Sequence, residues 1–182
     1  MDSQPDVIGF YHVPTGSIQY VVTDPSTRRC IVVDPVHDFD PRSGSTRTTS
    51  ADGLLRYIEA RELTLEWILD THPHADHFSA AAYLKDRSGA TTAIGERVKE
   101  VQRLWKTLYN LPDIVPTDGS QWDHLFANGE RFTVGEMEGY ALLSPGHTLC
   151  SDSFGRSSLL GGLLDVRVDL AAQRLKIDWL GE

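Results

Sequence analysis

The sequence predicts a single α/β domain. Three observations support this prediction. Segments typical of strands and helices alternate along the chain, histidines follow two of the predicted strands, and a length of 182 residues suits one hydrophobic core better than two. No internal repeat, low-complexity tract or interdomain linker interrupts the pattern. Residues 1–182 are therefore expected to form one domain.

The first half of the chain contains a predicted hairpin, a helix and a strand. Within residues 17–33, the runs IQYVV and CIVVD flank the polar turn DPSTRR, a pattern typical of two paired strands. The next segment is rich in Pro, Gly, Ser, Thr and Asp, and we expect a loop there until a helix at about residues 51–61. Residues 63–70, LTLEWILD, then have the composition of a buried strand.

The alternation continues beyond the middle of the chain. Residues 79–89, SAAAYLKDRSG, contain good helix formers and end in a glycine suited to a left-handed C-cap. Residues 90–95, ATTAIG, are a strand candidate, and apolar residues at helical spacing predict a helix over residues 96–109. The predicted order of elements is therefore that of an α/β protein.

A hairpin and a last strand are expected before residue 145. Residues 117–139 are predicted to form a loop and a short hairpin, with turns at Asn128-Gly129 and Gly135. The strand YALLS, residues 140–144, then brings the segment PGHT to a strand end. A second histidine position, His147, is thus expected at the edge of a sheet.

Composition excludes several classes of function. The chain has 17 Lys and Arg against 26 Asp and Glu, and a formal net charge of −9 repels phosphate backbones and anionic lipids. No apolar run approaches the roughly 20 residues that span a bilayer, and the N-terminus lacks a signal-peptide pattern. Cys30 and Cys150 lie in no CxxC pair and are expected to be reduced thiols. We therefore expect a cytoplasmic protein that binds neither nucleic acid nor membrane.

The segment THPHADH, residues 71–77, concentrates groups that bind metal ions. Three imidazoles and a carboxylate are costly to bury together without a partner, and their lone pairs converge naturally on a cation. In an extended segment His72 and His74 project to the same side, whereas Asp76 and His77 follow after a bend and face a second position. The spacing predicts a site for one or two metal ions. The histidines outside the two strand-end segments receive no functional role: His12, His37 and His124.

Two motifs carry a resemblance to a known family. THPHADH resembles the THxHxDH signature of the metallo-β-lactamase superfamily, and SPGHT, about 70 residues later, resembles its second signature. The segments VVDPVHDFDPRSG, IGERVKEVQ and PTDGSQWDHLFANGERF are similar to one branch of this superfamily. That branch contains persulfide dioxygenases and bacterial β-lactamase-like hydrolases, with glyoxalase II as a near relative. The resemblance covers about residues 6–150.

The resemblance implies a fold and a set of metal ligands. The fold is expected to be the metallo-β-lactamase-type αββα sandwich, with two mixed sheets face to face, helices outside and the metal site at the strand ends. In dinuclear hydrolytic members, residues matching His72, His74 and His147 hold one metal ion. Residues matching Asp76 and His77 help hold the other, which makes Asp76 the candidate catalytic residue as well.

The same resemblance implies two chemistries and leaves a third reading open. In persulfide dioxygenases one iron is bound by residues matching His72 and His147 and by a later aspartate. The remaining candidates then lie outside the coordination sphere: His74, Asp76 and His77. This reading implies Fe²⁺ and a small thiol persulfide, such as glutathione persulfide. The hydrolytic reading implies Zn²⁺ and a thioester or related ester. The third reading is a catalytically silent relative.

Residues 151–182 depart from the family pattern. They contain no histidine and no Gly-Asp motif for the later carboxylate ligand. Asp165, 18 residues after His147, is the nearest stand-in, and Asp169 is the next, although LLDVRVDL also alternates like an edge strand with surface charges. A shifted reading frame, a truncation or a divergent C-terminus would each give this pattern. An incomplete C-terminal half of the sandwich would expose apolar faces and a sheet edge, which favours a homodimer.

Overall fold

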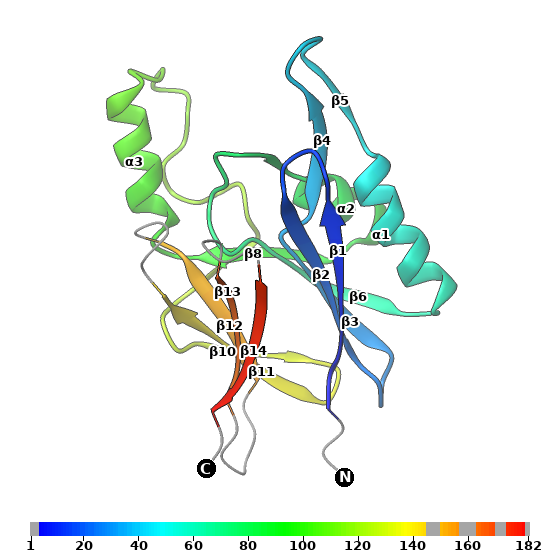
Figure 1. Cartoon of the computed structure of the whole chain (residues 1–182). Coiled ribbons are helices and arrows are strands. Elements are labelled where there is room, and N and C mark those ends of the chain that lie inside the picture. The colour runs from blue at the N-terminus through cyan, green and yellow to red at the C-terminus, as the bar shows by residue number, and fades with distance from the viewer. Residues whose placement is uncertain (1–3, 145–149, 157–162, 170–173, 181–182) are drawn as a thin grey trace.

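A six-stranded mixed sheet organises the fold (Figure 1). The computed structural model describes residues 4–144, 150–156, 163–169 and 174–180. The strands of this sheet are, in spatial order, β1 (Asp6–His12), β2 (Ser17–Asp24), β3 (Arg29–Val33), β6 (Thr64–Leu69), β8 (Thr91–Gly95) and β9 (His124–Phe126). Strands β1 to β3 pair antiparallel, whereas β3, β6, β8 and β9 pair parallel. The carboxyl ends of the parallel strands therefore meet at one edge.

Helices cover the outer face of this sheet. They are α1 (Thr49–Ala60) and α2 (Ala81–Ser88), and α3 (Val98–Leu108) follows β8. Leu54 and Leu84, one from each of the first two helices, are fully buried in one apolar cluster with Val32 and Ile68 of the sheet. Gly89 ends α2 with a φ of +74°, the left-handed C-cap that the sequence predicted. All three predicted helices and the strands over residues 17–33, 63–70 and 90–95 are confirmed, within a few residues at their ends.

A second, smaller sheet packs against the other face. It consists of β10 (Arg131–Val134), β11 (Met137–Leu143) and β12 (Asp152–Arg156), and the hairpin of β13 (Leu163–Asp169) and β14 (Arg174–Leu180) lies alongside it (Figure 1). Ile31 and Val33, on the face opposite to Val32, share a second apolar cluster with Phe132 and Ala141. The predicted double-sheet sandwich is therefore confirmed. Among the described residues, no helix packs extensively against β10 to β12.

Three parts of the sequence prediction are wrong or incomplete. The predicted loop before α1 contains β4 (Val36–Asp40) and β5 (Ser45–Arg47), which form a small sheet with β7 (Phe78–Ser79). Strand β1 was not predicted, and β9 pairs with β8 rather than in a hairpin turning at Asn128-Gly129. Strands β4, β5 and β9 are only three to five residues long, too short to carry the apolar alternation on which the prediction relied. The turn at Gly135, between β10 and β11, is confirmed.

Two composition-based expectations can be compared with the described residues. Within these ranges no helix combines the length and apolar character needed to cross a bilayer. Cys30 and Cys150 are both buried and form no disulfide, in agreement with the prediction of reduced thiols.

Strand β12 places the carboxyl group of Asp152 in the apolar interior. Asp152 is 7% exposed and lines a cavity of about 100 Å³ between the two sheets, whose other walls include Tyr20, Val33 and Phe154. A Cβ on Gly95 would lie 1.7 Å from its Oδ2 atom, so only glycine accommodates this carboxyl group. Burial raises the pKa of Asp152 to about 7, against the opposing effect of a backbone hydrogen bond from Gly95.

Asp152→Asn is expected to raise the free energy of unfolding at pH 8 by about 2 kcal/mol. A raised carboxyl pKa stabilises the fold below the unfolded pKa of about 4, and this contribution is lost as the pH rises through about 7. The gain in the variant should therefore shrink as the pH falls from 7 to 4. Urea unfolding at several pH values measures it, with the exposed Asp86→Asn as a control that should show no gain. An unchanged stability at pH 8 would contradict the assignment.

Candidate metal centre

The segment Thr71–His77 lies at the edge where the parallel strands end. It follows β6, between two neighbouring strands that also end here. The backbone N–H of Asp34, directly after β3, donates to the carbonyl of Leu69 (2.8 Å), and the N–H of Asp70 donates to the carbonyl of Ala93 (3.0 Å). Two aspartates thus follow adjacent parallel strands. Ligand sites in α/β sheets are found at this edge because side chains from several strands converge there.

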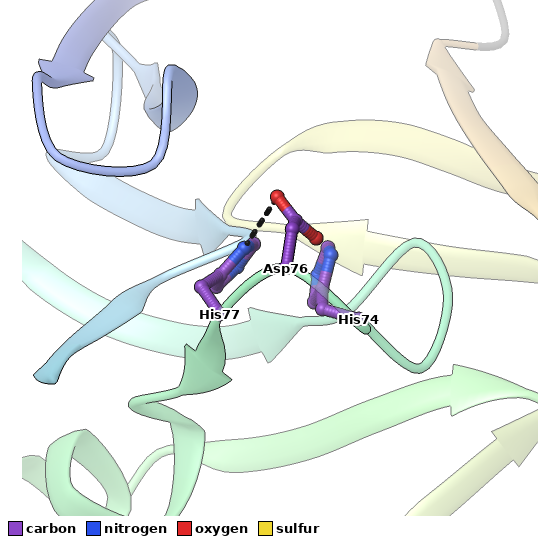
Figure 2. Close-up of side chains that lie close together, drawn as sticks. All are labelled: His74, Asp76 and His77. Carbon is purple, nitrogen blue, oxygen red and sulfur yellow. Dashed lines mark hydrogen bonds and ion pairs between the residues drawn. The ribbon is translucent and has the colours of Figure 1, made fainter. Parts of the chain in front are cut away.

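The histidine side chains gather on one side of this segment. The ring centroids of His72 and His74 are 4.2 Å apart, and those of His74 and His77 are 4.0 Å apart. Figure 2 shows His74, Asp76 and His77 together, and one potential ligand atom from each lies within 4.8 Å of the others. The same-side prediction for His72 and His74 is confirmed. Asp76 and His77, predicted to face a second position, converge on His74 as well.

Asp34 contacts the imidazole ring of His74 and fixes its orientation. Its Oδ1 atom lies 3.1 Å from Nε2 of His74, and its carboxylate also accepts hydrogen bonds from the backbone N–H (2.7 Å) and hydroxyl (2.8 Å) of Thr71. Burial acts to raise the pKa of Asp34, but His74 and Thr71 outweigh it and hold this pKa below its usual range. The φ of Asp34 is +50°, a left-handed conformation that Asp tolerates better than most residues. The contact leaves Nδ1 of His74 for a metal ion.

A second buried carboxyl group, that of Asp70, lies near Asp34. Asp70 is 2% exposed, and its two oxygens accept hydrogen bonds from the Ser79 hydroxyl (2.7 Å) and the Trp122 indole N–H (2.8 Å). Burial, followed by the charge of Asp34, raises the pKa of Asp70 to about 6. Ligand atoms of Asp34, Asp70 and His74 also lie within 4.8 Å of one another. His74 therefore belongs to both groups of converging atoms.

The hydrogen bonding of the two ring nitrogens of His77 indicates whether a cation fits the site. The His77 side chain is 3% exposed, and its Nδ1 atom lies 3.2 Å from Oδ2 of Asp76. Its buried Nε2 atom has no hydrogen-bond partner among the residues that the structure describes. Burial and the neighbouring His74 lower the pKa of His77, so its ring is neutral at pH 7. A neutral imidazole held at one nitrogen and unpaired at the other is the form that binds metal ions. The residues present fit a divalent cation with nitrogen and oxygen ligands.

The described residues contain four of the five predicted ligands. Nδ1 of His72 lies 2.9 Å from the hydroxyl of Thr71. His147 lies outside the described residues, and so do the side chains of Asp165 and Asp169, whose backbone forms part of β13. The assignment of the five ligands therefore stays a prediction.

Sequence reasoning missed the two aspartates that support the site. Asp34 and Asp70 are each the last residue of a predicted strand segment, and this position at the carboxyl end of a strand is the signal that identifies them. The histidine cluster, in contrast, lies within seven consecutive residues. Residues 40 positions apart, such as Asp34 and His74, meet only when β3 and β6 lie side by side.

The sequence profile of the Metallo-beta-lactamase superfamily matches residues 13–160. The chain belongs to this superfamily. A Beta-lactamase hydrolase-like protein of Xylella fastidiosa (strain Temecula1) is 61% identical over 150 residues, which are 82% of this chain and 35% of that protein. A Hydroxyacylglutathione hydrolase of Vibrio parahaemolyticus is 32% identical over 124 residues, or 68% of this chain and 37% of that protein.

A solved structure has a similar fold. ETHE1 from Myxococcus xanthus superposes with a TM-score of 0.60 at 23% sequence identity, over 83% of this chain and 53% of that chain. This likeness concerns the fold alone. The present chain spans only about a third of the length of the two curated relatives, at 35% and 37%. The superfamily membership agrees with the THPHADH segment and with the strand-end position of the candidate metal centre.

Proposed function

We propose that this chain carries a divalent-metal centre for chemistry on a small thiol derivative. The observation that supports the metal centre is the buried Nε2 atom of His77, which has no hydrogen-bond partner within the described part of the chain and belongs to a group with His74 and Asp76. An unpaired polar atom in the interior costs about 1 to 3 kcal/mol, and a bound cation removes this cost. The arrangement of Asp34 behind His74 is the support that metal-binding histidines usually have.

The proposed reaction is the oxidation of a thiol persulfide by dioxygen at iron. Support comes from the segments of this sequence that are similar to the persulfide dioxygenase branch, and from the 61% identity to a Beta-lactamase hydrolase-like protein, a group placed in the same branch. The name Hydroxyacylglutathione hydrolase indicates that one relative acts on a glutathione derivative. A small thiol is therefore the proposed carrier of the substrate.

Zinc-dependent hydrolysis of a thioester is the second candidate. The observation that favours it is the convergence of His74, Asp76 and His77, because the hydrolytic reading uses all three as ligands. Bound iron would activate dioxygen, whereas bound zinc would activate water. Asp34 would hold His74 in place in both cases. Nε2 of His77 would be a ligand in the hydrolytic reading and would lie outside the coordination sphere in the iron reading.

Metal content and substrate turnover distinguish the two reactions. The chain is purified without oxygen, with iron and zinc both supplied, and elemental analysis gives the metal ions per folded chain. We expect about one tightly bound iron and oxygen uptake with glutathione persulfide. Bound zinc with thioester cleavage, and no oxygen uptake, would replace the first reaction by the second. A folded chain that binds neither metal would overturn both, and the His72→Ala/His147→Ala double variant is the metal-free control.

A further inference from the structure

A line of polar side chains connects the start of α1 to the metal centre. Nε2 of His12 lies 3.1 Å from Oδ1 of Asp38 in β4, and Nδ1 of His12 lies 2.7 Å from the hydroxyl oxygen of Thr15. The hydroxyl oxygens of Thr15 and Ser17 are 2.7 Å apart. The Ser17 oxygen in turn lies 3.3 Å from Nδ1 of His77. A histidine that sequence reasoning left without a role thus begins a path to a candidate ligand.

The carboxylate at one end sets the direction of these hydrogen bonds. Burial acts to raise the pKa of Asp38, but hydrogen bonds from the backbone and hydroxyl of Ser50 and from His12 hold this pKa below its usual range. An ionised carboxylate only accepts, so Nε2 of His12 donates to it. In the neutral imidazole Nδ1 then accepts the hydroxyl hydrogen of Thr15. The Ser17 hydroxyl hydrogen then has two acceptors, the Thr15 oxygen at 2.7 Å and Oδ2 of Asp76 at 3.4 Å, and the nearer Thr15 oxygen forms the stronger hydrogen bond.

The last step acts on His77. The Ser17 oxygen, having donated its hydrogen, accepts a hydrogen bond from Nδ1 of His77, and this places the imidazole hydrogen on Nδ1 and the lone pair on Nε2. We propose that His12 is a positioning residue that holds His77, through two hydroxyl groups, in the tautomer whose Nε2 lone pair binds the metal ion. The inference rests on the proposed metal centre. It extends that proposal by identifying the residue, His12, that sets the tautomer of the candidate ligand His77.

The alternative support for this tautomer is weaker. Oδ2 of Asp76 also lies 3.2 Å from Nδ1 of His77, but the Asp76 side chain is 56% exposed and can rotate into solvent. The hydrogen-bonded side chains that lead from His12 to His77 have less freedom to move. His12 is 5% exposed at the end of β1, and the turn that follows is closed by a hydrogen bond from the N–H of Gly16 to the carbonyl of His12 (2.9 Å). Gly16 has a φ of +74°, which favours glycine.

A first experiment observes the tautomer directly in the metal-free chain. Histidine labelled with ¹⁵N is incorporated, and two-bond ¹H–¹⁵N correlations report which nitrogen of His77 carries the hydrogen. We expect the Nδ1–H form in the wild type and in Thr15→Ser, which keeps the hydroxyl group. Thr15→Val has nearly the same shape without a hydroxyl and should show a substantial Nε2–H population. His12→Gln keeps a donor that can reach Asp38 but has no acceptor at the position of Nδ1, and it should behave like Thr15→Val.

A second experiment measures Zn²⁺ affinity by competition with a coloured chelator. Thr15→Val and His12→Gln are expected to bind about 10-fold more weakly than the wild type, the usual effect of losing a group that supports a ligand. Thr15→Ser should stay within about twofold, a rescue that a loss of packing would not give. Urea unfolding checks that each variant folds. If His12→Gln does not fold, the comparison of Thr15→Val with Thr15→Ser still tests the inference.

The two experiments separate this inference from the proposed function. A wild-type His77 in the Nε2–H form would overturn the inference, and so would a Thr15→Val variant with unchanged tautomer and unchanged Zn²⁺ affinity. If the wild type binds no Zn²⁺, the proposed metal centre fails. The tautomer measurement, which needs no metal ion, still decides whether His12 controls His77.

Discussion

Replacing His74 by alanine is expected to weaken the binding of Zn²⁺ by more than about 100-fold. The hydrolytic reading makes His74 a ligand, and loss of a ligand exceeds the 10- to 100-fold effect of losing a group that supports a ligand. His74 belongs to both groups of converging ligand atoms, one with Asp76 and His77 and one with Asp34 and Asp70. Its side chain is 5% exposed, so water cannot readily take its place. No other described residue lies in both groups.

The measurement for His74→Ala combines elemental analysis with chelator competition on folded protein. His124→Ala is the matched control, because His124 pairs with Glu130 at 2.7 Å and belongs to neither group. The control should keep the metal content of the wild type. The His74 variant should also unfold more easily, since Asp34 would remain inside the protein without its histidine partner. A folded His74→Ala chain with the affinity of the wild type would remove this residue from the site.

Asp34→Asn is expected to weaken metal binding by about 10- to 100-fold, with a smaller effect on folding. The carboxylate of Asp34 accepts hydrogen bonds from His74 and from both the backbone and hydroxyl of Thr71. An asparagine side chain has one oxygen, so the substitution removes one of these acceptors and the negative charge beside His74. Asparagine tolerates the positive φ of this position, so the substitution tests the charge rather than the backbone.

The affinity of Asp34→Asn is compared with that of Asp40→Asn. The control makes the same chemical change in β4, at a carboxylate whose hydrogen bonds go to its own neighbours Arg42 and Ser43. It should bind metal like the wild type. Equal affinities for the two variants would show that Asp34 does not orient His74. A lowered affinity in Asp34→Asn alone, with normal unfolding, is the expected result.

Local pattern was sufficient to find the centre of the site. The strand LTLEWILD, the cluster THPHADH and the helix that ends at Gly89 each have a signal within about ten residues of sequence. Apolar composition predicted the strand, because it is buried on both faces between the helices and the second sheet. The approach of His72 to His74 follows from their spacing, since alternate residues of an extended segment point the same way.

The residues that support the histidines could not be identified from local sequence patterns. Asp34 and His12 lie 40 and 65 positions before the histidines that they support, His74 and His77, and neither belongs to an apolar pattern. Strand β4, which carries Asp38, was predicted as loop because its residues are mostly polar. Their roles depend on which strands become neighbours.

The sequence by itself determined the superfamily, the α/β order of elements and the histidine cluster at a strand end, because each depends on residues close together in the chain. Only the tertiary structure decided what surrounds that cluster. Parallel pairing of β3 with β6 brings Asp34 to His74, and the turn between β1 and β2 brings Ser17 to His77. Contacts of this kind follow from long-range strand pairing, and polar residues carry no periodic signal that predicts it.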